Sequence, residues 1–371
     1  MMILRLACAW ASVAAFLLFG DTLLSQLGAP LPSLLVFAWL LGVIVWAAFG
    51  VVHEAEELAH RLGEPYGTLI LTLSIVIIEV ALISAVMLGA KGAPTLGRDT
   101  MFAVLMIVLN GVVGIGLLLG GLRHFSQRYN LKGATSYLAV IIPLTVIALI
   151  LPNFTTSTSD GTLNTVQAIA FSIFTLALYG VFLALQTGRH RAFFQEPEAE
   201  RKPEPRVTEP DPARDALKPA SGSVTFAVVL LLANILPIVI LAKSLAVVLD
   251  FGIARLGAPP ALGGILIAMV VFTPECIAAL RAITANQLQR AINLCLGASA
   301  STLGLTVPAV LAIGLFTGQP VVLGLSNTNM VILAMTLLLS TLTFTGTRTT
   351  MMEGAVHLSV FFVFLVLVFS P

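Results

Sequence analysis

The chain has 371 residues, of which 58% are hydrophobic and only 10% are charged, and its net charge is +1. Soluble domains carry about 25% charged residues, so this composition excludes an ordinary soluble protein and indicates a membrane protein. The small net charge gives no basic character for binding nucleic acid. The cysteines, Cys8, Cys276 and Cys295, are odd in number and lie in apolar segments, which argues against a disulfide framework or a cysteine metal site.

Apolar stretches long enough to cross a bilayer follow one another along the chain. Eleven are predicted, at about residues 3–20, 32–52, 66–89, 100–121, 134–151, 164–186, 223–249, 260–281, 288–316, 320–345 and 352–370. The first could be a signal peptide, but Trp10 and the lack of a small-x-small cleavage pattern near Asp21 favour a retained helix. We therefore expect an all-α polytopic membrane protein with about 11 transmembrane helices.

One long polar stretch, residues 189–222, separates the sixth and seventh spans, and its Pro, Glu and Arg content indicates a solvated linker. Placing this linker in the cytoplasm puts 15 Lys and Arg residues on that side, against Lys91, Arg98 and Arg255 on the other. Because positive residues concentrate on the cytoplasmic side, the split predicts a cytoplasmic N-terminus and a C-terminus on the outer side, which would be the periplasm in a bacterial inner membrane.

An internal repeat joins the two halves of the chain. The pattern Arg-Leu-Gly-x-Pro occurs at residues 61–65 and again at 255–259, each time before a span that carries one deep glutamate. These glutamates are Glu79 and Glu275. Five spans separate the copies, and an odd number makes them enter the membrane from opposite faces. This arrangement is typical of the inverted-topology repeats of secondary transporters.

Glu79 and Glu275 are the only acidic residues well inside the predicted spans. A carboxylate in hydrocarbon costs several kcal/mol unless it is paired, protonated or facing water, so such residues mark ion or proton pathways. The alternative is a protonated structural glutamate hydrogen-bonded between helices. Thr273 and Pro274 precede Glu275, and we expect Pro274 to interrupt the helix and free backbone carbonyls for a hard cation.

Small and polar residues in the spans after the glutamate helices could supply further ligands or could simply allow close packing. They are Asn110, Asn293, Gly297, Ser299 and Ser301. At the predicted cytoplasmic end of the second span, His53 is followed by acidic residues that could attract cations or form a solvated helix end. These acidic residues are Glu54, Glu56 and Glu57.

The stretches HEAEELAHRLGEPYG and GASASTLGLTVP resemble the repeat motifs of cation/proton exchangers in the calcium/cation antiporter superfamily. The resemblance covers nearly the whole chain and matches Glu79 and Glu275 to the glutamate of each inverted repeat. The implied fold is a peripheral helix (1–31), a five-helix repeat (32–188), the linker (189–222) and a second five-helix repeat (223–371). The family's usual Gly-Asn before the first glutamate is absent, which predicts weaker calcium coordination or a preference for monovalent cations.

The expected function is antiport of calcium, sodium or potassium against protons. We expect the protein to be embedded in the lipid bilayer and to need no cofactor. Glu79 and Glu275 would face each other near the midplane, where burial and mutual repulsion favour protonation and let protons and a cation compete. A channel or uniporter using the same carboxylates without obligatory proton coupling is the alternative. An embedded enzyme is disfavoured, because HExxH and GxSxG are absent and all five histidines, including His357, are predicted at or near span ends.

Overall fold

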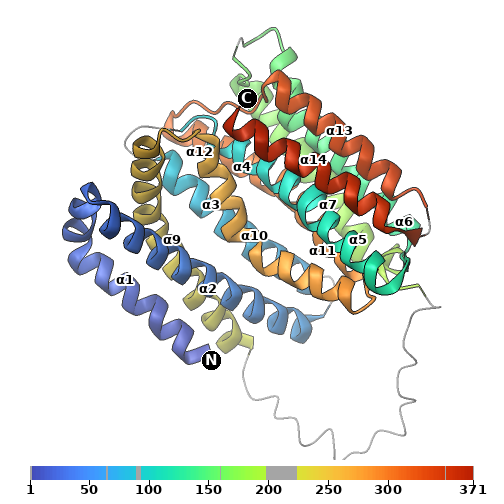
Figure 1. The fold of residues 1–371 in the computed structure, drawn as a ribbon, viewed down its shortest axis with the longest axis horizontal. Helices are drawn as coiled ribbons and strands as arrows, with labels where there is room; N and C mark the ends of the chain where they lie inside the picture. The colour runs from blue at the N-terminus through green and yellow to red at the C-terminus, as the bar shows by residue number, and fades with distance from the viewer. Residues whose placement is uncertain are drawn as a thin grey trace, which may run out of the picture.

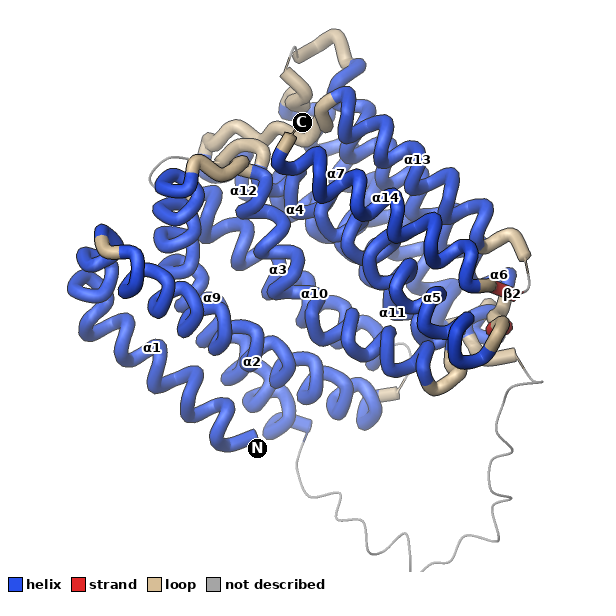
Figure 2. Tube along the Cα trace, in the orientation of Figure 1, coloured by secondary structure: helices blue, strands red, loops and turns tan. Residues whose placement is uncertain are grey.

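A computed structural model describes residues 2–63, 66–88, 93–158, 160–197, 224–346 and 348–370. Most of the predicted linker, residues 198–222, lies outside these ranges, as do Glu64 and Pro65 of the first Arg-Leu-Gly-x-Pro pattern. In the described part of the chain nearly all residues are helical (Figure 2).

Long apolar helices make up the bundle. The first half contains α1 (Met2–Ser25), the turn η1 (Gln26–Gly28), α2 (Pro30–Leu62), α3 (Tyr66–Met87), α4 (Leu96–Leu105), η2 (Met106–Val112), α5 (Val113–His124), α6 (Leu131–Thr145), η3 (Val146–Ile150), η4 (Leu151–Phe154), α7 (Thr165–Thr187) and the turn η5 (Arg191–Phe194). The second contains α9 (Val224–Leu256), α10 (Ala261–Thr284), α11 (Leu288–Ser301), η6 (Thr302–Thr306), α12 (Val307–Thr317), α13 (Asn327–Thr343) and α14 (Met351–Phe369).

The expected polytopic all-α fold is confirmed. Among the described residues, ten helical segments are long and apolar enough to cross a membrane, and α13 is a shorter apolar helix of 17 residues. Large apolar side chains such as Leu17 and Phe316 are exposed on the outside of the bundle, as a lipid-facing surface requires. The chain ends lie on opposite faces, and α1 packs against α2 and α9 at the edge (Figure 1).

Three details of the sequence interpretation are wrong. The second span continues beyond residue 52 to Leu62, so the acidic cluster lies within α2. The tenth begins at Asn327 rather than 320, because Gly318 ends α12 in the left-handed conformation with φ 70°. Pro274 does not interrupt α10, which runs continuously through it, although the carbonyl of Val270 loses its usual donor. Membrane helices tolerate proline where their surroundings satisfy the freed backbone groups.

The two faces of the bundle can be told apart by their arginines. We call the face with Arg61, Arg123 and Arg290 the basic face. There the two-stranded sheet of β1 (Gln127–Arg128) and β2 (Arg348–Thr349) joins the α5–α6 and α13–α14 connections. At the opposite face, Arg98 donates to the carbonyl of Gly324 and Arg255 to that of Gly28. Because α3 starts at the basic face and α10 at the opposite one, these helices run in opposite directions, as predicted for inverted repeats.

Helices α5 and α14 approach each other through glycines. A Cβ added to Gly354 would lie 2.5 Å from the backbone nitrogen of Leu118 and 2.8 Å from the carbonyl oxygen of Gly114. A Cβ on Gly121 would lie 2.8 Å from the nitrogen of Met351. Since these neighbours are backbone atoms that cannot move aside, only glycine fits, and small residues of this kind bring membrane helices into close contact.

The variant Gly354→Leu should therefore destabilise the bundle, whereas Gly42→Leu should not, because nothing lies within 4 Å of a Cβ at Gly42. Overpacking costs roughly 1–3 kcal/mol, and more where backbone must move. Heating the detergent-purified proteins and measuring the monodisperse fraction should give a clearly lower midpoint for Gly354→Leu alone. Equal midpoints for the two variants would contradict the close packing of α5 and α14.

Candidate functional site

Glu79 lies in the middle of α3 with its side chain fully buried. The hydroxyls of Thr302 and Thr306 both donate to its Oε2, over 3.2 and 2.9 Å. These threonines belong to η6, a π-helical turn in the span formed by α11, η6 and α12. Residues four apart share one side of a helix, so both hydroxyls reach the same oxygen. Such π-helical turns often occur at functional sites.

Glu275 lies in α10 and is only 7% exposed. It is close enough to Glu79 and to Glu56 for both carboxylates to interact with it electrostatically. Among the residues that the structure describes, none forms a hydrogen bond to Oε1 of Glu79 or to either oxygen of Glu275, although the backbone N–H of Glu275 lies near its own carboxylate. Buried polar atoms normally have a partner, and a buried unpaired charge is costly. These three oxygens are therefore placed to accept a proton or a cation.

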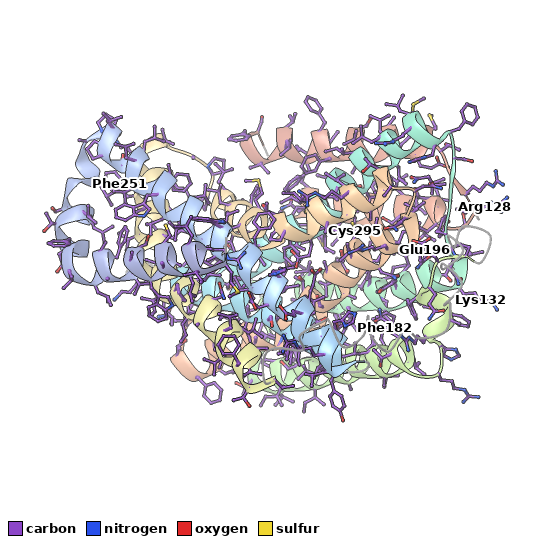
Figure 3. The ribbon with its side chains drawn as sticks, turned by 90° about the horizontal axis from the view of Figure 1, so that it is seen from below. Arg128, Lys132, Phe182, Glu196, Phe251 and Cys295 are labelled. Carbon is purple, nitrogen blue, oxygen red and sulfur yellow. The ribbon has the colours of Figure 1, made fainter. Side chains whose placement is uncertain are left out.

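A cavity of about 360 Å³ connects Glu275 with the basic face. Its deep end is lined by Glu275 and Ser301, and its outer part by Glu56, Arg191 and Arg290. The wall is formed mainly by α11, with α7, α3 and α10 supplying most of the rest. Figure 3 shows Lys132 and Glu196 towards the end of the molecule at which this cavity opens, with Cys295 deeper in the bundle.

Between Glu275 and the opposite face, α10 packs closely against α4. A Cβ on Gly264 would lie 2.7 Å from the carbonyl carbon of Asp99 and 2.7 Å from the nitrogen of Thr100. The backbones of α10 and α4 are therefore in direct contact at this level, with no room for a side chain between them.

The acidic cluster on α2 divides into residues with different partners. Only Glu56 lines the cavity. Glu54 is buried and lies 3.8 Å from Arg5 of α1. Glu57 pairs with Arg61 at the surface, one helical turn away. The predicted acidic entrance therefore reduces to one carboxylate on the cavity.

Several predicted ligands do not meet the glutamates. Asn110 donates to Thr336 and faces His357. Ser299 is fully buried and donates to the carbonyl of Cys295 within its own helix. Thr273 donates to the carbonyl of Met269. None of these side chains is hydrogen-bonded to Glu79 or Glu275, and none lines the cavity.

Three others lie on the cavity wall. Ser301 is near its deep end, Gly297 lies beside the hydroxyl of Tyr137, and Asn293 is nearer the mouth. Asn293 donates to the carbonyl of Phe194 and so holds the turn η5 against α11. The structure therefore brings Glu56, Glu275 and Ser301 to one cavity, with Glu79 buried close to Glu275.

Sequence reasoning missed Thr302 and Thr306. Their spacing of four residues within an apolar helix was the available signal, because it places two hydroxyls on one side. In the described part of the chain, no group of three or more His, Cys, Asp or Glu side chains is gathered as a metal centre. The site is thus built from two carboxylates and neutral hydroxyls.

A bundle of membrane-crossing helices with buried carboxylates at the end of a cavity defines a multi-pass ion transporter. The chain belongs to the family described as sodium/calcium exchanger protein, whose model matches residues 32–188 and 226–370. It is 38% identical over 331 residues to the sodium-potassium/proton antiporter ChaA of Escherichia coli, covering 89% of this chain and 87% of that protein. It is 40% identical over 343 residues to y4hA of Sinorhizobium fredii, covering 92% and 90%.

Solved structures share the fold. The structure of native YfkE matches with a TM-score of 0.73 at 17% identity and covers 100% of both chains. The H⁺/Ca²⁺ exchanger CAX matches with a TM-score of 0.69 at 14% identity, covering 98% of this chain and 87% of that one. Since its relatives are ion exchangers and not enzymes, the expectation that the chain is not an enzyme is confirmed.

Two alanines of α11 that lie two residues apart can be used to test whether water reaches the cavity. Ala298 lines it, whereas Ala300 is fully buried away from it. In protein whose own cysteines are replaced by serine, Ala298→Cys should react with a small cationic methanethiosulfonate reagent at least tenfold faster than Ala300→Cys. The measurement is the fraction labelled with time, by mass spectrometry. Equal rates would mean that no water-filled path reaches this part of α11.

Proposed function

We propose that the chain is a cation/proton antiporter of the bacterial inner membrane, in which Glu79 and Glu275 bind protons and a cation in turn. The observation that carries this proposal is the set of three unpaired carboxylate oxygens, two on Glu275 at the cavity wall and one on the nearby, fully buried Glu79. They come from the corresponding helices of two inverted repeats, which is where secondary transporters place their binding sites.

Coupling between the proton flux and the cation flux follows from the free-energy cost of leaving the two carboxylates charged with no cation bound. Two carboxylates within an apolar bundle repel each other and lack solvent, so the site is favourable only when protons or a cation neutralise it. A cation arriving from the cavity displaces protons, and protons arriving from the other side displace the cation. Because the site rarely stays empty, one flux requires the other.

The path we propose runs from the basic face past Glu56 to Glu275 and then to Glu79. Glu56 is exposed on the cavity and interacts electrostatically with Glu275, so it can hold a cation on its way in. Exposure to the opposite face would require α10 and α4 to separate at Gly264 while α3 and α11 close together. Movement of one group of helices against the rest provides such alternating access.

We place the basic face in the cytoplasm. The support is the concentration of Lys and Arg residues on that side of the spans, which sets orientation in the membrane. The N-terminus would then be cytoplasmic and the C-terminus periplasmic, and the described conformation would open to the cytoplasm. Its cavity would receive the cation that is exported.

We propose sodium and potassium as the preferred cations. Calcium takes six to eight oxygen ligands. The neutral groups beside the two glutamates are hydroxyls of Thr302, Thr306 and Ser301, while the amide of Asn110 points elsewhere. A small oxygen set suits monovalent cations better, and the E. coli relative bears the name sodium-potassium/proton antiporter.

The exchange is tested in inside-out vesicles with a pH-sensitive dye. Adding sodium or potassium to energised wild-type vesicles should release protons, with a smaller response to calcium. Glu79→Gln and Glu275→Gln should each lower the rate at least tenfold, because the amide can neither release a proton nor neutralise a cation. Normal rates in both variants would refute the site. Cation uptake that moves no protons would instead favour a channel or uniporter.

Glu56 and Glu57 form a matched pair for the entrance. Glu56 lines the cavity, whereas Glu57 pairs with Arg61. Glu56→Gln should raise the cation concentration giving half-maximal rate about threefold or more, because one attractive charge near the site is lost. Glu57→Gln should leave it unchanged. The same dye assay measures both, and an equal effect of the two substitutions would rule out a specific role for Glu56.

A further inference from the structure

His357 is a buried ionisable residue that the proposed exchange does not use. It lies in the second turn of α14, inside a membrane span, and its side chain has no exposure to solvent. It lies near the start of its span, as expected, but neighbouring helices enclose it. Ionisable residues inside membrane bundles are costly and are functional candidates by default.

A chain of hydrogen bonds with a defined direction runs to one ring nitrogen. The hydroxyl of Thr336 donates to the carbonyl of Ile332 over 2.9 Å. Its oxygen can therefore accept from the amide nitrogen of Asn110, over 2.8 Å. This fixes the Asn110 amide with its oxygen towards Nδ1 of His357, 3.1 Å away. An amide oxygen only accepts, so Nδ1 must carry a proton and donate it.

The other ring nitrogen is also paired. Nε2 of His357 lies 3.0 Å from the hydroxyl of Thr343. In the neutral ring this nitrogen accepts, and the hydroxyl donates. The ring thus joins α14 to the end of α13 on one side and to η2 on the other. A backbone interaction with Leu109 adds a second link to η2.

The opposite side of η2 forms a wall behind Glu275. Val108 lines a small gap together with Phe272, Glu275 and Cys295. Residues two apart on a helical turn point to different sides, so Val108 faces the site while Asn110 faces His357. The turn η2 is π-helical, a rare form that occurs frequently at functional sites.

Close packing leaves the ring little freedom. A Cβ on Gly114 would lie 3.1 Å from Cβ of His357, and one on Gly111 would lie 3.4 Å from the ring of Phe361. The charged neighbour on its own helix is Glu353, which caps the start of α14 through Thr350. The groups that face the ring from η2 and α13 are the neutral side chains Asn110 and Thr343.

We propose that His357 is a positioning residue: through Asn110 it holds the η2 turn in place, so that Val108 closes the back of the Glu275 site and sets its affinity for the cation. The inference rests on the proposed function for its effect on transport. Its effect on η2 stands independently of transport and can be measured separately.

The transport test compares two substitutions of His357. Asn can keep the donor to Asn110, because its amide nitrogen occupies the place of Nδ1, whereas Leu of similar volume removes it. His357→Leu should raise the half-saturating cation concentration about tenfold with little loss of maximal rate. His357→Asn should stay within about threefold of wild type. Asn110→Leu should match His357→Leu, and the double variant should be no worse, since residues acting as one unit are not additive.

A second measurement needs no transport. Cys295 lines the same gap as Val108 and is 4% exposed. With Cys8 and Cys276 replaced by serine, its reaction with N-ethylmaleimide should be at least threefold faster in His357→Leu than in wild type or His357→Asn. The thermal midpoint of the purified variants checks that each protein is folded, because general misfolding would lower maximal rate without raising the half-saturating concentration.

Each failure points to a different conclusion. An unchanged Cys295 rate and an unchanged half-saturating concentration in His357→Leu overturn the positioning role. Impairment of His357→Asn equal to that of His357→Leu, with a shifted pH profile, overturns it too and assigns the ring itself to proton transfer. If wild type shows no cation-driven proton movement, the proposed function fails, while the Cys295 measurement still decides the role of His357.

Discussion

The burial of two carboxylates without a full set of partners is the constraint on which the rest of this structure depends. Glu79 receives hydroxyl donors at one oxygen, while its second oxygen and both oxygens of Glu275 are unpaired among the described residues. Purely structural glutamates would be expected to have partners at each oxygen. The missing partners, the cavity that ends at Glu275 and the contact of α10 with α4 are all explained if the site exists to be filled and emptied by small cations.

The two repeats use the same construction with different results. Each glutamate helix is followed by a span with a π-helical turn in its middle, η2 in the first repeat and η6 in the second. The turn η6 directs Thr302 and Thr306 to Glu79, whereas η2 directs Asn110 away from Glu275 and towards α13 and α14. Glu79 is consequently supported by hydroxyls and Glu275 is left open to the cavity. In the proposed exchange, this asymmetry makes Glu275 the carboxylate that an arriving cation would meet first.

The sequence was sufficient to predict the features that depend on hydrophobicity and on the positions of residues along the chain. The spans follow from apolar length, and Glu79 and Glu275 follow from their isolation within them. The remaining features depend on which way a side chain points after packing. Glu54, Glu56 and Glu57 are nearly adjacent, yet they face Arg5, the cavity and Arg61. Asn110 looked like a ligand because amides suit cations, but Thr336 and His357 satisfy it. The presence of Pro274 led us to predict a break in α10, but the helix continues through this residue.

The two sides of the site differ: one has a close helix contact and the other has a cavity. This difference explains how the proposed exchange could be reversible with only small movements of helices. On one side, Gly264 lets the backbones of α10 and α4 touch. On the other, Leu71, Thr72 and Ile75 of α3 face α11 across the cavity. The helices α3 and α10 correspond to each other and run in opposite directions. If α3 closed onto α11 while α10 separated from α4, the close contact would move from one glutamate helix to the other. In the proposed exchange the second state would replace one close helix contact by the corresponding contact of the other repeat, so that binding of a cation or of protons could decide which state is populated.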